Sequence, residues 1–236
     1  MTMLVFAWAN PTYSGTPTSH LQPEEGYYGF QMFNPYYEAV SERLLSSSSY
    51  RKCQAVFLPS FTPESAVYIE YISEDPNTPP VVVSLQLEEQ LWYEMQKLME
   101  SQNKGKRFNP ADKQVQRKVF SQINSIINRS EAPIETEVAI KLEEAWDTML
   151  LHTHYHTETG RGLDGVNYHF ANFVKEYGYR TGKVWSPEKG TASYQLVELA
   201  KALQKYPTLD KESRDSAIKD MMNRAQQLTV LLKSNE

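Results

Sequence analysis

Hydrophobic residues recur along the chain at two spacings, which predict strands in some segments and helices in others. Strand patterns come first: residues 54–58 are a short apolar run, residues 67–72 are rich in β-branched and aromatic side chains, and residues 81–87 alternate apolar with polar positions. Prolines between these segments indicate turns. We therefore expect a small antiparallel sheet. The helical patterns that follow make the predicted fold class α+β, with several amphipathic helices packed on that sheet.

Apolar residues spaced three to four positions apart predict the helices. Asn34 before Pro35 is typical of a helix start, because asparagine can cap the first backbone N–H groups and proline fits the first helical position. In the second predicted helix, Trp92 widens an apolar stripe that we expect to face the core. The predicted helices are 35–45, 88–102, 110 to 126 or 127, 135–151, 193–206 and 211–233.

A second pair of strands is predicted after residue 163. Asp164-Gly165 is typical of a tight turn, and the strand after it places Tyr168 and Phe170 on one face and His169 on the other. Residues 177–185 are expected to return beside this strand, with Trp185 in the layer of Tyr168 or Phe170. We expect four of these residues to form the structural centre of the fold: Asp164, Tyr168, His169 and Trp185.

The length of the chain, 236 residues, fits one large domain. Residues 10–31 are rich in Pro, Gly, Ser, Thr and Tyr without a period, so we assign residues 1–33 to an irregular N-terminal segment and residues 34–236 to a single α+β domain. The apolar run 3–9 is either a first strand or the remnant of an export signal, although it is short and lacks a positively charged start. The expected location is cytoplasmic as the sequence stands and periplasmic if an export signal ended at Ala9.

Charge and composition exclude several classes of protein. The 24 basic and 29 acidic residues give a formal net charge of −5, and no stretch interleaves basic with aromatic residues, so we expect no nucleic-acid partner. No run approaches the roughly 18 apolar residues of a membrane span, so none is expected. The single cysteine, Cys53, excludes an intramolecular disulfide and a multi-cysteine metal site.

Three alternating histidines, His152, His154 and His156, are the main candidates for chemistry. On a strand, the period of two places all three imidazoles on one face, about 7 Å apart along the chain. On a helix, His152 and His156 form an i, i+4 pair. Either geometry can bind zinc, and an open position on the metal would activate water for hydrolysis. A fourth ligand is available nearby in Glu158, Asp164 or His169.

The same residues have interpretations that need no metal. The three histidines can be an exposed helix end, where a cationic side chain complements the helix dipole. His169 with Asp164 can form a general base with the group that orients it, or a purely structural hydrogen bond. We therefore assign no catalytic residue and expect no cofactor, with zinc as the alternative.

Several motifs resemble those of a group of uncharacterised bacterial proteins. The resemblance rests on Leu163-Asp164-Gly165, Tyr168-His169-Phe170 and Trp185-Ser186-Pro187, and on Phe57-Leu58-Pro59-Ser60-Phe61 in the N-terminal half. It implies a bacterial origin and a compact α+β domain, but no reaction. Basic residues other than histidine often occupy the positions of His152 and His154 in that group. This chain departs from the pattern there, which weakens the zinc hypothesis.

Two functions from different classes remain. The first is a non-catalytic binding protein, such as an immunity or inhibitor protein for a toxin or cell-wall enzyme. It follows from the modest acidic charge, the absence of a catalytic signature and the tyrosines near the N-terminus. The alternative is a metal-dependent hydrolase that uses the histidine cluster. The oligomeric state stays open, because the last helix could also pair with another subunit. We expect a protein partner to contact four tyrosines: Tyr27, Tyr28, Tyr36 and Tyr37.

Overall fold

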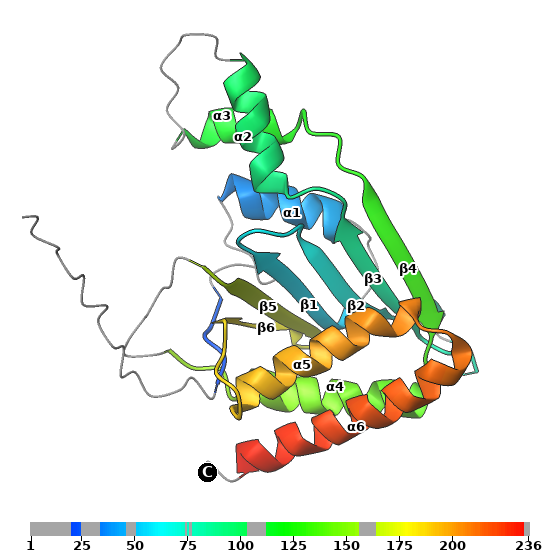
Figure 1. Cartoon of the computed structure of the whole chain (residues 1–236). Helices are drawn as coiled ribbons and strands as arrows, with labels where there is room; N and C mark the ends of the chain where they lie inside the picture. The colour runs from blue at the N-terminus through cyan, green and yellow to red at the C-terminus, as the bar shows by residue number, and fades with distance from the viewer. Residues whose placement is uncertain are drawn as a thin grey trace, which may run out of the picture.

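The computed structural model describes residues 20–24, 34–45, 51–73, 75, 77–102, 112–155 and 164–233. Over these residues the strands form one antiparallel sheet in the order β4-β3-β2-β1-β5-β6 (Figure 1). The α+β fold predicted from the sequence is confirmed. The run at residues 3–9 lies outside the described residues. The strands are β1 (Arg51–Pro59), β2 (Ser65–Glu70), β3 (Val81–Leu87), β4 (Ile127–Pro133), β5 (Val166–Val174) and β6 (Gly178–Trp185).

Helices cover both faces of this sheet. Figure 1 shows α4, α5 and α6 together on one side and α1 on the other, with α2 and α3 beyond it. No helix in the described part of the chain is both long and apolar enough to span a membrane. The helices are α1 (Pro35–Leu44), α2 (Leu91–Gln102), α3 (Lys113–Phe120), α4 (Thr136–Leu151), α5 (Ala192–Lys205) and α6 (Lys211–Lys233), with a short 3-10 turn at Tyr206–Thr208.

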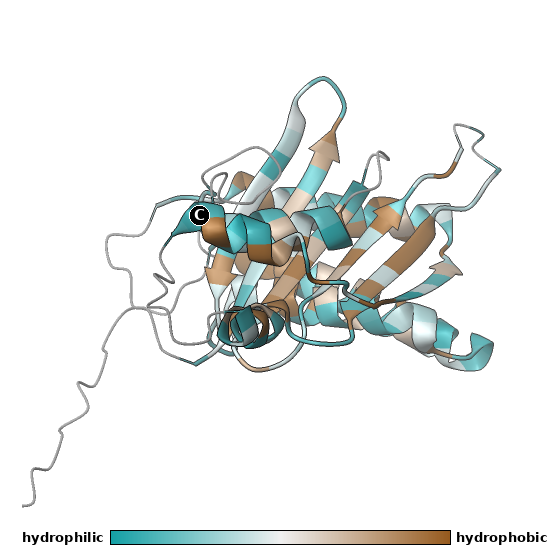
Figure 2. Cartoon of the chain, turned by 90° about the horizontal axis from the view of Figure 1, so that it is seen from above, coloured by the Kyte–Doolittle hydropathy of each residue, from teal (hydrophilic) through white to brown (hydrophobic). Residues whose placement is uncertain are grey.

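Strand alternation divides the hydrophobic core into two clusters. Val83, Leu85 and Leu87 of β3 pack with α1, α2 and α3, as the alternation in the sequence predicts, while Val82 belongs to the cluster under α4, α5 and α6. Successive side chains of a strand point to opposite faces, so the sheet is buried on both. Figure 2 shows hydrophobic residues concentrated along the central strands.

The third predicted helix is wrong in its second half. Helix α3 ends at Phe120, and the chain continues into the edge strand β4. Ile126 and Ile127, which we expected on a buried helical face, are 62% and 37% exposed. Ala132 alone is buried among the residues of β4. This strand is held by its backbone pairing with β3. Because its side chains are mostly exposed, its sequence has no apolar alternation that would predict a strand.

The expected position of Trp185 is also wrong. The register of β5 and β6 pairs Trp185 with Asn167 and Val184 with Tyr168. Directly paired residues share a face, so Val184 lies in the layer of Tyr168, and Trp185 is on the face of His169. The prediction missed by one residue, and a slip of one residue moves a side chain to the opposite face of a sheet.

Strand β1 is central and pairs with both β2 and β5. A bulge interrupts its pairing with β2 between Lys52 and Ala55, and Cys53 there has a φ of 48°. The Cys53 N–H donates to Oδ1 of the buried Asn172 at 3.0 Å, which satisfies a backbone group that the bulge removes from the ladder. Burial raises the pKa of the Cys53 thiol, so this side chain is a poor nucleophile.

Candidate functional site

His152 caps the C-terminal end of α4, and His154 follows it two residues later. The Nδ1–H of His152, the residue after the last helical position, donates to the Thr148 carbonyl at 2.7 Å. Nδ1 of His154 lies 2.9 Å from the carbonyl of His152, and its ring stacks on His20. These contacts use backbone carbonyls and a ring face rather than a common ligand. His156 and Glu158 lie outside the described residues.

Within the described ranges, no group of three or more His, Cys, Asp or Glu side chains could hold a metal ion. Of the proposed fourth ligands, Asp164 is exposed in the turn before β5 and His169 is buried within it. The described residues alone therefore do not form the predicted zinc site. The three-histidine hypothesis stays a prediction from the sequence.

Residues 20–24, which we predicted to be irregular, connect the segment of His152 and His154 to the sheet. The Leu21 carbonyl accepts the His154 N–H at 3.0 Å, and Gln22 exchanges two backbone hydrogen bonds of 2.8 Å with Lys183 at the edge of β6. Leu21 is fully buried against Gly182, where an added Cβ would lie 2.9 Å from the leucine side chain. No sequence pattern pointed to this segment.

Glu24, not Asp164, is the acidic partner of His169. Nδ1 of the imidazole lies 2.7 Å from Oε1 of Glu24, and the side chains are 5% and 2% exposed. Burial raises the pKa of Glu24, although the nearby His169 and Lys183 oppose the rise. The ring of Tyr37 packs edge-on against His169, with ring centroids 5.5 Å apart. The pair is therefore enclosed by β5, residues 20–24 and α1, which favours a structural role.

Glu24→Gln is expected to change how stability depends on pH. A carboxyl group whose pKa is higher in the folded state stabilises the fold below its unfolded pKa, and this contribution is lost as the pH rises through the folded pKa. The unfolding free energy of the wild type minus that of Glu24→Gln should thus fall with rising pH, by about 1.4 kcal/mol per unit of pKa shift. Urea unfolding from about pH 4 to about pH 8 measures it. Glu188→Gln, at an exposed site, is the control, and a difference that stays constant or rises contradicts the expectation.

A second candidate site lies where α1, α2 and α3 meet, and we call it the tyrosine pocket. It is a surface hollow of about 280 Å³. Tyr36 and Tyr37, two of the four predicted contact residues, line it together with Trp92. Tyr27 and Tyr28 lie outside the described residues. The complete lining is Asn34, Pro35, Tyr36, Tyr37, Trp92, Lys113 and Gln116.

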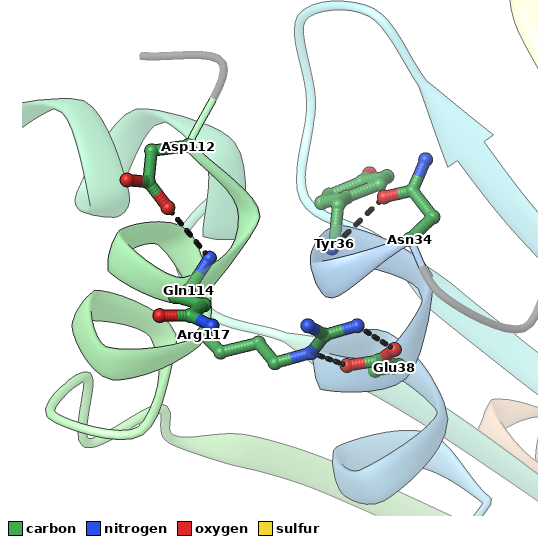
Figure 3. Close-up of polar contacts among 6 residues, drawn as sticks. All are labelled: Asn34, Tyr36, Glu38, Asp112, Gln114 and Arg117. Carbon is green, nitrogen blue, oxygen red and sulfur yellow. Dashed lines mark hydrogen bonds and ion pairs between the residues drawn. The ribbon is translucent and has the colours of Figure 1, made fainter. Parts of the chain in front are cut away.

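Helix ends and one ion pair hold the walls of the tyrosine pocket in place (Figure 3). Oδ1 of Asn34 accepts the Tyr36 N–H at 3.0 Å, which caps α1 as the sequence predicts. Asp112 caps α3 in the same way, through the Gln114 N–H at 2.9 Å. Arg117 of α3 makes a bidentate contact with Glu38 of α1, at 2.6 and 2.7 Å. The two-point geometry of this pair fixes the orientation of α3 against α1.

The buried carboxylate of Glu64 anchors Tyr36, one of the residues that line the tyrosine pocket. Its Oε1 accepts the Tyr36 hydroxyl at 2.8 Å, and its Oε2 accepts the Leu91 N–H at the start of α2 at 3.0 Å. Burial, with the carboxylate beside it, raises the pKa of Tyr36, so the phenol stays protonated and donates. One carboxylate thus connects the start of β2 to α1 and α2.

Trp92 lines the tyrosine pocket, although its helical spacing predicts a core position. Its side chain is 38% exposed and meets the ring of Tyr36 edge-on, with centroids 5.9 Å apart. The neighbouring Tyr93 is 51% exposed. Tyr36 and Tyr37 are half-buried rather than fully exposed. The helical spacing of Trp92 also fits the buried stripe of Leu91, Met95 and Met99, so no signal in the sequence distinguished it from a core residue.

No family model matches the chain, and neither the curated proteins nor the solved structures include a match. The resemblance to a bacterial group therefore stays a prediction, but two of its motifs meet in space. A Cβ added to Gly165 would lie 2.5 Å from Oγ of Ser186 and 2.7 Å from the Trp185 ring. The Val166 N–H donates to the same Ser186 hydroxyl at 3.0 Å. This turn is therefore packed closely against the end of β6, and a side chain larger than that of glycine does not fit at position 165.

Proposed function

We propose that this chain is a non-catalytic binding protein that recognises another protein through the tyrosine pocket. The observation that carries the proposal is the placement of Trp92, 38% exposed, beside Tyr36 and Tyr37 at a concave surface. Tryptophan and tyrosine are the residue types that most often dominate binding energy at protein interfaces. Lys113 and Gln116 add a polar rim, as such interfaces require.

The rigidity of the pocket supports the same proposal. The bond from Tyr36 to Glu64 and the ion pair between Arg117 and Glu38 fix the walls before any partner arrives. A partner then loses less free energy in ordering side chains on binding. The proposal extends to an immunity or inhibitor protein for a toxin or cell-wall enzyme. The net charge of −5 would speed association with a basic effector of that kind.

Trp92→Ala is expected to weaken partner binding by about 30-fold, the loss typical of a central aromatic contact. Wild-type protein and variants serve as baits in a pull-down from the native lysate, and the recovered protein is purified so that its affinity can be measured by calorimetry. Leu151→Ala is the matched control, because Leu151 is 63% exposed but belongs to α4, on the other side of the sheet.

The expected result is a stoichiometric partner that Leu151→Ala retains and Trp92→Ala loses. A partner bound equally by both variants would move recognition away from the tyrosine pocket. Turnover of a substrate by the purified protein, with no stoichiometric partner recovered, would overturn the binding function itself.

A further inference from the structure

A larger hollow lies on the opposite face of the sheet, beneath the end of α5, and we call it the α5 cleft. Its volume is about 400 Å³, within the range of about 300–1,000 Å³ that is typical of small-molecule sites. It shares no residue with the tyrosine pocket. Its lining is Phe57, Pro59, Thr62, Pro63, Ser65, Ser84, Gln86, Val166, Tyr168, Lys201, Gln204, Lys205 and Thr208.

One row of paired residues across four strands forms the floor of the α5 cleft. Gln86 pairs with Ser65, Ser65 with Phe57, and Phe57 with Tyr168. Residues paired directly across strands share a face, so these four side chains point into the same space. The rings of Phe57 and Tyr168 meet edge-on, with centroids 5.6 Å apart. The floor is therefore polar at one end and aromatic at the other.

Two buried serines give the polar end an unused capacity for hydrogen bonding. Ser65 is 6% exposed and Ser84 is 8% exposed, and both line the cleft. Neither hydroxyl has a hydrogen-bond partner within the described ranges of the chain. The two hydroxyl oxygens are open to the cleft rather than enclosed, so both can donate to the acceptor oxygens of a ligand bound there.

The roof of the cleft is positively charged. Lys201, Gln204 and Lys205 are spaced i, i+3 and i+4, so they share one side of α5, beside the buried stripe that contains Leu196, Leu199 and Leu203, and they line the cleft from there. Lys201 is paired with Glu198 at 2.9 Å and lies over the Tyr168 ring at 5.8 Å. Lys205 has no ion pair in the described part of the chain. The lining includes no Asp or Glu, so one positive charge is available to a ligand.

We propose that the α5 cleft binds a small aromatic monocarboxylate. Its ring lies against Phe57 and Tyr168, and its carboxylate faces Lys205 and the hydroxyls of Ser65 and Ser84. One uncompensated lysine with two neutral donors matches a single negative charge better than the double charge of a phosphate monoester. The edge-on aromatic floor favours a flat, apolar body over an aliphatic chain.

Matched pairs of acids and amides test this proposal by ligand-observed NMR and calorimetry on the full chain. The probes are benzoate, phenylacetate and indole-3-acetate, each compared with its neutral amide. We expect at least one acid to bind at least about tenfold more tightly than its amide. We expect Lys205→Met to abolish this difference and Ser84→Ala to weaken binding of that acid about threefold or more.

The control variants separate this site from others. Lys141→Met removes an exposed lysine of α4 and should leave acid binding unchanged, as should Trp92→Ala in the tyrosine pocket. Binding of no acid at millimolar concentration, or equal binding of acids and amides, overturns the proposal. So does acid binding that is unaffected by Lys205→Met. A phosphate monoester such as phenyl phosphate that binds more tightly than every acid overturns the assignment to a monocarboxylate.

Discussion

Glu64→Ala is expected to lower the free energy of unfolding by about 2–4 kcal/mol. The variant removes the acceptor of both the Tyr36 hydroxyl and the Leu91 N–H, and Glu64 is fully buried. A buried donor that loses its partner costs about 1–3 kcal/mol. The removal of a buried carboxylate returns part of this loss, because the charge no longer needs to be desolvated.

Urea unfolding measures this effect, with the midpoint and slope fitted separately. Glu100→Ala, at an exposed position of α2, is the matched control and should lie within about 0.5 kcal/mol of the wild type. Tyr36→Phe removes one of the two bonds and should fall between them. If Glu64→Ala were as stable as Glu100→Ala, the carboxylate would not hold α1 and α2 to the sheet. The Tyr36–Glu64 bond would then not make the tyrosine pocket rigid.

Trp146→Ala is expected to cost more, about 3–5 kcal/mol, which is the usual loss when a large buried ring is truncated. Trp146 is fully buried on α4 and meets Phe170 of β5 edge-on, with centroids 5.7 Å apart. Its Nε1 has no hydrogen-bond partner in the described part of the chain. The stabilisation therefore comes from packing, and Trp146→Phe, which keeps a ring without the N–H, should lose much less.

Trp92→Ala is the control for this second measurement, because it makes the same substitution at a half-exposed site. It should cost less than about 1 kcal/mol, while both tryptophan variants keep the wild-type dependence of unfolding free energy on urea. Equal losses in the two variants would show that Trp146 is no more important to the core than a surface ring.

The elements that the sequence predicted well are those with a local cause. The alternation from Val81 to Leu87 has buried apolar residues on one face, so it fixed both ends of β3. The sustained apolar stripe of α6 gave its bounds, Lys211–Lys233, as the structure has them. Asn34 and Pro35 marked the start of α1 because a side-chain cap acts within three residues.

What the sequence could not predict depends on contacts between distant residues. Glu24 and His169 are 145 positions apart, and Tyr36 and Glu64 are 28 apart. No period of two or 3.6 encodes such a pair. Strand β4 was missed for a related reason, since its place comes from backbone pairing with β3 and not from its own side chains.

The residues of the candidate sites also differ in whether a local signal in the sequence predicts them. Residue type alone pointed to Tyr36 and Tyr37, and the structure places both at the tyrosine pocket. Residue type did not reveal Trp92, because its helical spacing also fits a core stripe. No sequence pattern predicts the α5 cleft, because its floor consists of one residue from each of four strands.

The central position of β1 also sets the order in which the chain can fold. The β1–β2–β3 meander and the β5–β6 hairpin each join neighbouring segments, but β1 meets β5 only through partners such as Cys53 and Asn172, 119 positions apart. Contacts of such long range form slowly. At about 5–20 residues per second, the ribosome takes on the order of ten seconds to deliver β5 after β1. During that interval an apolar strand edge is exposed, and an exposed edge of this kind is a site for aggregation until the two halves of the sheet close.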